Sequence, residues 1–421
     1  MKNTGLSKKK KTYRQMLWAA LAVTMTVLVF HFFISMDRAI PDDICIFAGQ
    51  EEAFSFSWPV KVELDPECVD VLNARTEQIN ELTISPGVKG NYQGKIKLFG
   101  LINYKNITFH VIEEQKLMPC GKVVGLYVHC DGILVLGTGE VENQYGEKSE
   151  PAKNKVKSGD YIEKIDGVKV KTIEDVSKCL SDLKKDTISL VIRRDGTRYH
   201  TQLNVVFGRD KTPRLGIWIR EDTQGIGTVT YVDENNGFGA LGHGISDSDT
   251  GNLMEIADGN MYDTKILKLI KGQAGSPGEL MGMIDLSNAR ALGYVDKNTE
   301  LGIYGRVNTS EELVYNEETA MPIGLKQNVH KGKASILCQL DGQVQEYEIQ
   351  IEEIDINDKK NKSMVLRVSD EELLKKTGGI IQGMSGSVIL QDEKIIGAVT
   401  HVFVNDPTRG YGVFIENMLQ N

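Results

Sequence analysis

The chain has 421 residues, of which 41% are hydrophobic and 25% are charged, and its formal net charge is −9. This composition excludes wholesale disorder and collagen-like repeats, and the acidic balance excludes a dominant nucleic-acid surface, because phosphate binding needs clustered Lys and Arg. The length suggests two or three domains, and the 42 glycines indicate many tight turns in a body built mainly of β-strands.

The N-terminus combines a basic tail with an apolar stretch. Residues 1–15 carry six Lys and Arg side chains and no acid, and residues 16–36 carry no formal charge. About 20 apolar residues span a bilayer as a helix, and a preceding basic cluster stays cytoplasmic. A cleavable signal peptide is the alternative, but its apolar core is shorter, about 7–15 residues, and needs a small-residue cleavage site that the sequence lacks. We therefore predict a cytoplasmic tail, a signal-anchor at residues 16–36 and an extracytoplasmic body.

Residues 37–105 form a juxtamembrane region with alternating, strand-like stretches near residues 55–64 and 94–100. The chain has six cysteines, which form no Cys-x-x-Cys motif, and no His pair stands at metal-ligand spacing. Disulfides are permitted outside the membrane. Buried free thiols are nevertheless the state that we expect for most of the cysteines.

Residues 106–206 have the pattern of a small β domain with one helix. Strand-like runs at residues 123–128 and 132–137 are expected to pair with each other. Apolar residues Ile173, Val176, Leu180 and Leu183 then recur at helical spacing, with Thr172 as the expected N-cap. A strand that ends in an Asp-Gly turn at residues 195–196 follows.

This block resembles a PDZ domain. The matching residues are Pro151-Ala152, Gly159-Asp160, Ile165-Asp166-Gly167 and the helix that begins near Thr172. PDZ domains bind a peptide as an added strand and hold its terminal carboxylate on backbone N–H groups. The resemblance implies that carboxylate loop at Gly125, Leu126, Tyr127 and Val128, although Tyr127 replaces the second glycine of the usual motif. A structural β domain without a peptide ligand is the alternative.

Residues 207–421 are rich in Gly, with strand-like runs and little helical periodicity, which predicts a β-sandwich or barrel. Gly237, Gly239 and Gly242 match the Gly-x-Gly-x-x-Gly pattern of dinucleotide sites. Such a site needs the motif to open an apolar helix after a strand. A polar, turn-like stretch follows here instead, so we exclude a nucleotide site.

A Gly-Met-Ser-Gly-Ser turn at residues 383–387 precedes a strand-like run and can hold Ser385 on a tight bend. The N–H groups of Gly383 and Ser385 could then bind a developing oxyanion. A serine nucleophile needs a base, and His243, between two glycines, is the candidate. An ordinary turn is the alternative for a motif as short as this.

Longer stretches resemble the peptidase domain of the stage IV sporulation protein B (SpoIVB) serine peptidase family. They are the runs at residues 215–251, which contain Gly242-His243-Gly244, and at residues 376–412, which contain the turn around Ser385. The order of membrane anchor, PDZ domain and peptidase also matches. The resemblance implies a mainly β chain whose residues 207–421 form a chymotrypsin-like double β-barrel.

The resemblance further implies His243 as general base, Ser385 as nucleophile and Asp370 as the acid that orients the base. Asp370 stands before a polar helical stretch, so a helix N-cap is its alternative role, and Asp285 is then the substitute acid. His401 is expected to be a pocket-wall or strand residue rather than the base. This chemistry requires no metal or organic cofactor.

The family's members act in sporulation signalling. The resemblance implies an endopeptidase that works between the forespore and mother-cell membranes, cleaves itself and a membrane-bound regulator, and thereby activates a protease that processes a late sigma factor. Its expected partners are that protein substrate, a peptide ligand of the PDZ domain, with its own chain as one candidate source, and the membrane through the N-terminal helix, but no nucleic acid. A non-catalytic PDZ-bearing scaffold and a degradative housekeeping protease are the alternatives.

Overall fold

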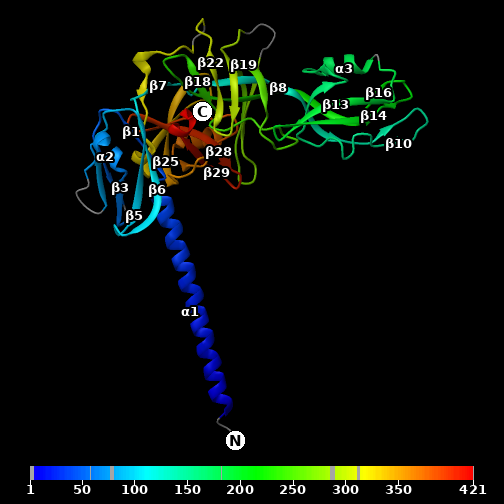
Figure 1. Cartoon of the computed structure of the whole chain (residues 1–421). Coiled ribbons are helices and arrows are strands. Elements are labelled where there is room, and N and C mark those ends of the chain that lie inside the picture. Colours follow the sequence, from blue (N-terminus) through cyan, green and yellow to red (C-terminus); the bar gives the residue numbers. More distant parts are fainter. Residues whose placement is uncertain are drawn as a thin grey trace. The chain divides into compact units, whose positions relative to one another are not determined.

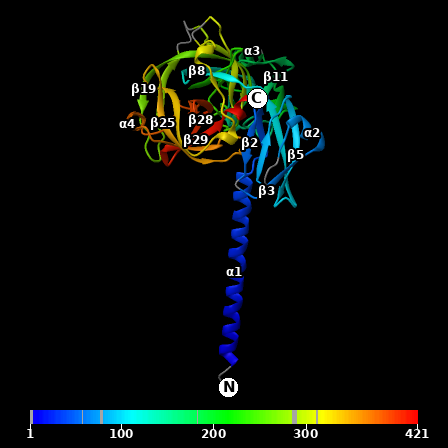
Figure 2. The same cartoon turned by 90° about the vertical axis from the view of Figure 1, so that its left-hand side faces the viewer.

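The computed structural model describes residues 4–56, 58–75, 80–181, 183–284, 290–310 and 313–420. The fold is mainly β, as predicted, with one long N-terminal helix (Figures 1 and 2). The chain forms two compact units. The first comprises Met1–Glu114 with Leu325–Asn328 and Asp355–Asp358, and the second comprises the remainder.

Helix α1 (Thr4–Ala39) contains the predicted span, and its segment Lys10–Ala39 is long and apolar enough to cross a membrane. Apolar side chains such as Leu21 and Phe30 are exposed. Two hydroxyl groups of the span donate to the carbonyls four residues earlier, which leaves no unsatisfied donor on them in an apolar medium. These features are consistent with a single-pass anchor.

The first unit is a small β domain on the end of α1. Its main sheet has the order β1-β6-β5-β3, and a second pair joins β2 to β4. The elements are β1 (Asp43–Phe47), β2 (Glu52–Ser55), β3 (Val60–Leu64), α2 (Pro66–Leu72), β4 (Glu81–Ile84), β5 (Gly90–Leu98) and β6 (Ile102–Ile112). The predicted boundary at residue 105 would cut β6, which stays paired with the parallel strand β1 as far as Ile112.

Two short segments from later in the chain complete this unit. Lys326 is buried and its ammonium group lies 2.5 Å from the carboxylate of Asp43 on β1. The Gln327 side chain donates to the Cys45 carbonyl, and the Asn357 side chain accepts from the Asp42 N–H. Strand β1 is thus held by its neighbour β6 and by these polar contacts.

The second unit contains two rings of strands. In the first, six strands are joined in the order β8-β19-β21-β22-β18-β17, and β17 pairs again with β8. The strands are β8 (Val123–Thr138), β17 (Ile217–Val232), β18 (Gly237–Ala240), β19 (Ile256–Ile270), β21 (Gly293–Thr299) and β22 (Gly302–Val307). Leu126, Val128, Val229, Phe238 and Met261 belong to its buried core. Strands β7 (Lys116–Pro119), β20 (Glu279–Ile284) and β23 (Met321–Pro322) extend this sheet.

The second ring is a closed barrel of six strands in the order β24-β25-β26-β29-β28-β27. The elements are β24 (Gly332–Gln339), β25 (Val344–Ile354), β26 (Met364–Val368), α4 (Glu371–Thr377), β27 (Val388–Gln391), β28 (Lys394–Phe403), β29 (Asp406–Phe414) and α5 (Ile415–Leu419). The two rings fit the expected double-barrel architecture, and the mainly β fold class is confirmed.

Strands β8 and β17 continue from the first ring into a region around helix α3 (green in Figure 1). Its elements are β9 (Val141–Glu142), β10 (Lys148–Ser149), β11 (Tyr161–Ile165), β12 (Val168–Lys169), α3 (Ile173–Ser181), β13 (Thr187–Arg194), β14 (Thr197–Asn204), β15 (Val206–Phe207) and β16 (Pro213–Arg214). The predicted helix is confirmed, and the Thr172 hydroxyl accepts from the Asp175 N–H as the expected cap. The runs at residues 123–128 and 132–137 are not two paired strands but one strand, β8.

Candidate active site

Ser385 lies on a tight turn that precedes β27 of the second ring and is hydrogen-bonded to β17 of the first ring. Its carbonyl accepts a hydrogen bond of 2.9 Å from the N–H of Thr228 on β17. The next residue, Gly386, has φ +96°, and a Cβ atom there would clash with the Thr228 carbonyl. Only glycine fits this position, because it tolerates the left-handed backbone and lets β17 approach. The turn therefore presents Ser385 against a strand of the first ring.

The same turn leaves two N–H groups available. Within the described part of the chain, the N–H groups of Gly383 and Ser385 have no hydrogen-bond acceptor, whereas those of Met384, Gly386 and Ser387 each donate to a carbonyl. Stabilisation of an oxyanion requires unused N–H groups of this kind, at the serine itself and two residues before it. The geometry is thus compatible with the oxyanion site expected at Gly383 and Ser385.

His243 follows β18 on a loop that lies against the closed barrel. Leu241 and Gly242 both have left-handed φ angles, +69° and +67°. A Cβ atom on Gly242 would lie 3.0 Å from the Thr400 side chain on β28, so small size permits the approach. The His243 Nδ1 atom lies 2.9 Å from the Gly244 carbonyl. A carbonyl only accepts, so Nδ1 carries the proton and Nε2 is left as an acceptor, the tautomer that a general base needs.

The structure brings His243 and Ser385 to the same strand but not into a hydrogen bond with each other. The Ser385 hydroxyl donates to the Thr400 carbonyl at 2.7 Å. The neighbouring residue, His401, packs its ring against that of His243, with centroids 4.7 Å apart and planes tilted by 34°. Both imidazoles line a cavity of about 590 Å³, together with Lys360, Lys362 and other side chains. His401 is therefore a wall residue of this cavity, as expected.

Both imidazoles are neutral at physiological pH. Burial lowers the pKa of His243, and the hydrogen bond to Gly244 only partly opposes this effect. Desolvation of the His401 ring lowers its pKa to about 4, and repulsion from the protonated form of His243 and from Lys362 acts in the same direction. Neutral imidazole is the form that accepts a proton from serine.

Asp370 lies at a different place in the fold. Its carboxylate accepts the N–H of Leu373, at 2.9 Å, and so caps helix α4, and its other oxygen lies 3.4 Å from the N–H of Glu348. These contacts correspond to the alternative role of helix N-cap. Among the residues that the structure describes, no carboxylate makes a hydrogen bond to His243. The substitute acid, Asp285, lies outside the described residues.

Comparison with known families gives the classification. A profile described as SpoIVB peptidase S55 matches residues 211–419. These residues belong to the SpoIVB peptidase family. No curated protein matches the chain. The matched segment contains His243, Asp370 and Ser385 but does not include β8 or α3. On the basis of this match, the protein is a SpoIVB-like peptidase of sporulation.

The loop of this SpoIVB-like domain that follows His243 is fixed by two side chains that sequence reasoning missed. Asn298 on β21 accepts from the Ile245 N–H and donates to the Ile245 and Met254 carbonyls. Arg220 on β17 forms ion pairs with Asp247 and Asp249. The polar residues 246–251 indicated a turn. The sequence pattern does not show which side chains from distant strands bind this turn, so Asn298 and Arg220 could not be identified from it.

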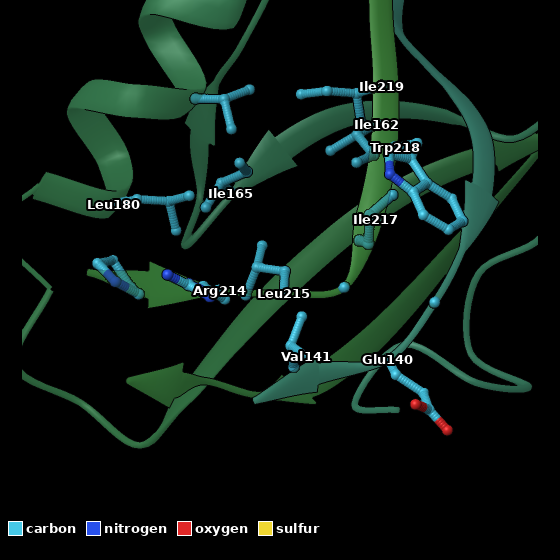
Figure 3. Close-up of a pocket in the computed structure, with 14 residues that line it drawn as sticks. Glu140, Val141, Ile162, Ile165, Leu180, Arg214, Leu215, Ile217, Trp218 and Ile219 are labelled. Carbon is cyan, nitrogen blue, oxygen red and sulfur yellow. The ribbon is translucent and has the colours of Figure 1, made fainter. Parts of the chain in front are cut away.

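The α3 region contains an apolar hollow of about 330 Å³ (Figure 3). Val176 and Leu180 of α3 line it on one side, and Ile217 and Ile219 of β17 line it on the other. In Figure 3, Ile219 points toward the helix, whereas the Trp218 ring lies on the opposite side of the strand.

The four residues expected to form the carboxylate loop are not among those that line this hollow. Gly125, Leu126, Tyr127 and Val128 lie within β8, which pairs with β17 on one side and β19 on the other. Their N–H groups lie in a sheet paired on both edges, and Leu126 and Val128 are buried in the ring core. The hollow is lined instead by the turn at residues 215–217, where Gly216 has φ +67°. A similar glycine-apolar pattern occurs at both places, so the sequence did not distinguish them.

Proposed function

We propose that the protein is a membrane-anchored serine endopeptidase in which Ser385 is the nucleophile and His243 the general base. The observation that supports this most directly is that the Ser385 turn and the His243 ring both contact β28, at Thr400 and His401. Within the described structure the turn leaves the N–H groups of Gly383 and Ser385 without an acceptor, and the Nε2 atom of His243 can accept a proton. The family match to a sporulation peptidase agrees with it. Asp370 is left out of the machinery, because its carboxylate caps α4.

The proposed reaction begins with rotation of the Ser385 hydroxyl away from the Thr400 carbonyl. The Nε2 atom of His243 takes the hydroxyl proton while Oγ attacks the scissile carbonyl carbon, and the oxyanion that forms binds the N–H groups of Gly383 and Ser385. His243 then gives its proton to the leaving amine as the C–N bond breaks. Water, deprotonated by His243, cleaves the ester, which yields the carboxylate product and restores Ser385.

The proposed location follows from the N-terminal charges. With the basic tail before α1 in the cytoplasm, the parts of the chain that follow α1 are extracytoplasmic. From the role of the SpoIVB family, the proposed compartment is the space between the forespore and mother-cell membranes. The proposed substrates are the chain itself and a membrane-bound regulator of the protease that processes a late sigma factor.

The α3 hollow is the proposed site for an extended peptide of the substrate or of the chain itself. Residues 217–220 of β17 pair with β8 on one side, and within the described residues no strand pairs with their other side. A peptide could add there as a strand and place an apolar side chain against Val176 and Leu180. This supports a PDZ-like function for the region.

The test uses the full chain in detergent and a fluorophosphonate, which reacts covalently with an activated serine. We expect the wild type to gain one probe mass on Ser385 and to release self-cleavage fragments. Ser385→Ala should do neither, and His243→Ala should do both at least 10³-fold more slowly. Ser387→Ala is the matched control, because Ser387 lies in the same turn and its side chain is fully buried. A folded wild type that neither labels nor cleaves would contradict the proposal and favour the scaffold alternative.

A further inference from the structure

Strand β17 touches three functional places in turn. Ile217 and Ile219 line the α3 hollow, and Arg220 binds the loop that carries His243. Thr228, eight residues later, donates its N–H to the Ser385 carbonyl and its hydroxyl to the Gly383 carbonyl. One continuous backbone therefore joins the hollow, the base loop and the nucleophile turn.

The contact of Arg220 with the loop after His243 fixes both the position and the orientation of that loop. Asp247 is only 2% exposed, and one of its oxygens accepts the N–H groups of Asp249 and Thr250 while the other accepts from Arg220. The second arm of the guanidinium binds Asp249 at 2.7 Å. A planar fork that spans two carboxylates fixes direction as well as distance. The loop is thus locked to β17 four residues after His243.

The register of β17 changes on both sides of this contact. Its pairing with β8 shifts between Trp218 and Ile219 and again between Arg220 and Asp222. Such bulges bend a strand locally and re-aim its side chains. Arg220 therefore stands on a short segment whose direction depends on residues 217–219, which line the hollow.

We propose that Arg220 is a positioning residue that makes the placement of His243 depend on the packing of the α3 hollow. This inference rests on the proposed function of His243 and Ser385. A change in the hollow moves the segment at residues 217–220, the guanidinium moves with it, and the loop at residues 244–254 follows. Asn298 holds the same loop from β21, a strand that does not line the hollow. Of these two anchors, Arg220 is the one whose strand lines the hollow.

The experiment is a double-mutant cycle on the full chain, with the maximal rate of fluorophosphonate labelling of Ser385 as the readout. Leu180→Trp fills the hollow from α3, and Leu180→Ala empties it as a second variant. Arg220→Lys keeps the positive charge but cannot bind Asp247 and Asp249 with the two arms of a planar guanidinium group. Asn298→Ala is the matched control. Only variants whose thermal melts remain cooperative are compared.

We expect Arg220→Lys to lower the maximal labelling rate about tenfold with little change in the affinity for the probe, because a misplaced base slows the reaction step. Leu180→Trp should change the rate in the wild type and in Asn298→Ala by the same factor, but should have no effect in Arg220→Lys. Equal factors in all three backgrounds would overturn the proposal, as would an unchanged rate in Arg220→Lys. Absence of labelling in the wild type would instead overturn the proposed function itself.

Discussion

The nucleophile turn and the base loop depend to different degrees on side chains. The turn at Ser385 is fixed by main-chain hydrogen bonds, from Thr228 N–H to the Ser385 carbonyl and from Gly386 N–H to the Val399 carbonyl, and the hydroxyl groups of Thr228 and Thr230 add bonds to its carbonyls. The loop after His243 is fixed by two side chains: Asn298 binds its ends at Ile245 and Met254, and Arg220 binds Asp247 and Asp249 between them. Main-chain bonds do not titrate and survive most substitutions, whereas side-chain anchors can be lost one at a time. The position of His243 should therefore be more sensitive to single substitutions than the position of Ser385.

The largest effect should come from placing a side chain where the main chains meet. Gly386→Ala puts a Cβ atom onto the Thr228 carbonyl in a left-handed conformation. We expect a stability loss of roughly 3 kcal/mol and loss of Ser385 labelling, measured by thermal melting and intact mass. Gly275→Ala has a similar φ, +83°, but open space around its Cβ position, so it should cost only about 1 kcal/mol. Equal losses in the two variants would show that the close approach at Gly386 is unimportant.

Removal of a side-chain anchor should have the next largest effect. Asp247→Asn leaves Arg220 facing a neutral amide, and we expect about 2 kcal/mol of destabilisation and slower labelling. Burial opposes ionisation of Asp247, but the Thr250 and Asp249 amides and Arg220 outweigh it and hold the pKa of this carboxyl below its ordinary value.

The stabilisation from Asp247 is therefore present above the unfolded pKa of about 3.9 and is lost as pH falls through the lower folded pKa. Urea titrations between pH 7 and pH 3 should show this loss in the wild type and less of it in Asp247→Asn. Asp249→Asn is the control, because Asp249 is half exposed and its loss should cost less than about 1 kcal/mol. A wild-type profile that Asp247→Asn leaves unchanged would argue against this anchor.

The two stacked imidazoles should set the acid limit of activity. A lowered pKa keeps His243 neutral below the ordinary value of about 6.5, so labelling should persist to a lower pH than for an exposed histidine. His401→Ala admits water to the His243 ring and reduces its desolvation, so the acid limb should move to higher pH. His401→Phe keeps the stacked ring and should keep the limb in place. A limb that moves equally in both variants would indicate that the stacking of the rings is not the cause.

The smallest effect on reaction rate should come from Asp370. Asp370→Ala removes the cap of α4 and should cost about 1 kcal/mol, whereas Asp370→Asn keeps a capping oxygen and should cost less. Both should label Ser385 within a few-fold of the wild-type rate. If Asp370 oriented His243, the rate would instead fall on the order of 10⁴-fold in both. Labelling rates beside thermal melts separate the two roles.

The sequence predicted local features better than distant contacts. The apolar span, the helix capped by Thr172 and the Asp195-Gly196 turn depend on neighbouring residues, and the structure has all three. The long strand β8 was read as two strands because Asp131-Gly132 resembles a turn, although Gly132 is continuous with the strand at φ +106°. The alternation of apolar residues does not indicate which strands pair with each other. For that reason the sequence did not predict the partners of β8, the position of the hollow or the role of Arg220.

Because β1 is held by pairing and by side-chain contacts, a cut in the chain after β1 would not by itself detach the rest of the molecule from α1. Residues 48–51 connect β1 to β2, and a cut there would leave α1 and β1 on one fragment. That fragment would remain attached through the parallel pairing of β1 with β6 and through Lys326 and Gln327, which belong to the other fragment. A molecule nicked at this point would run as two bands on a denaturing gel and as one particle under native conditions. With α1 as the proposed membrane anchor, the rest of the molecule would leave the bilayer only after β1 separates from β6, so proteolysis alone would not release it.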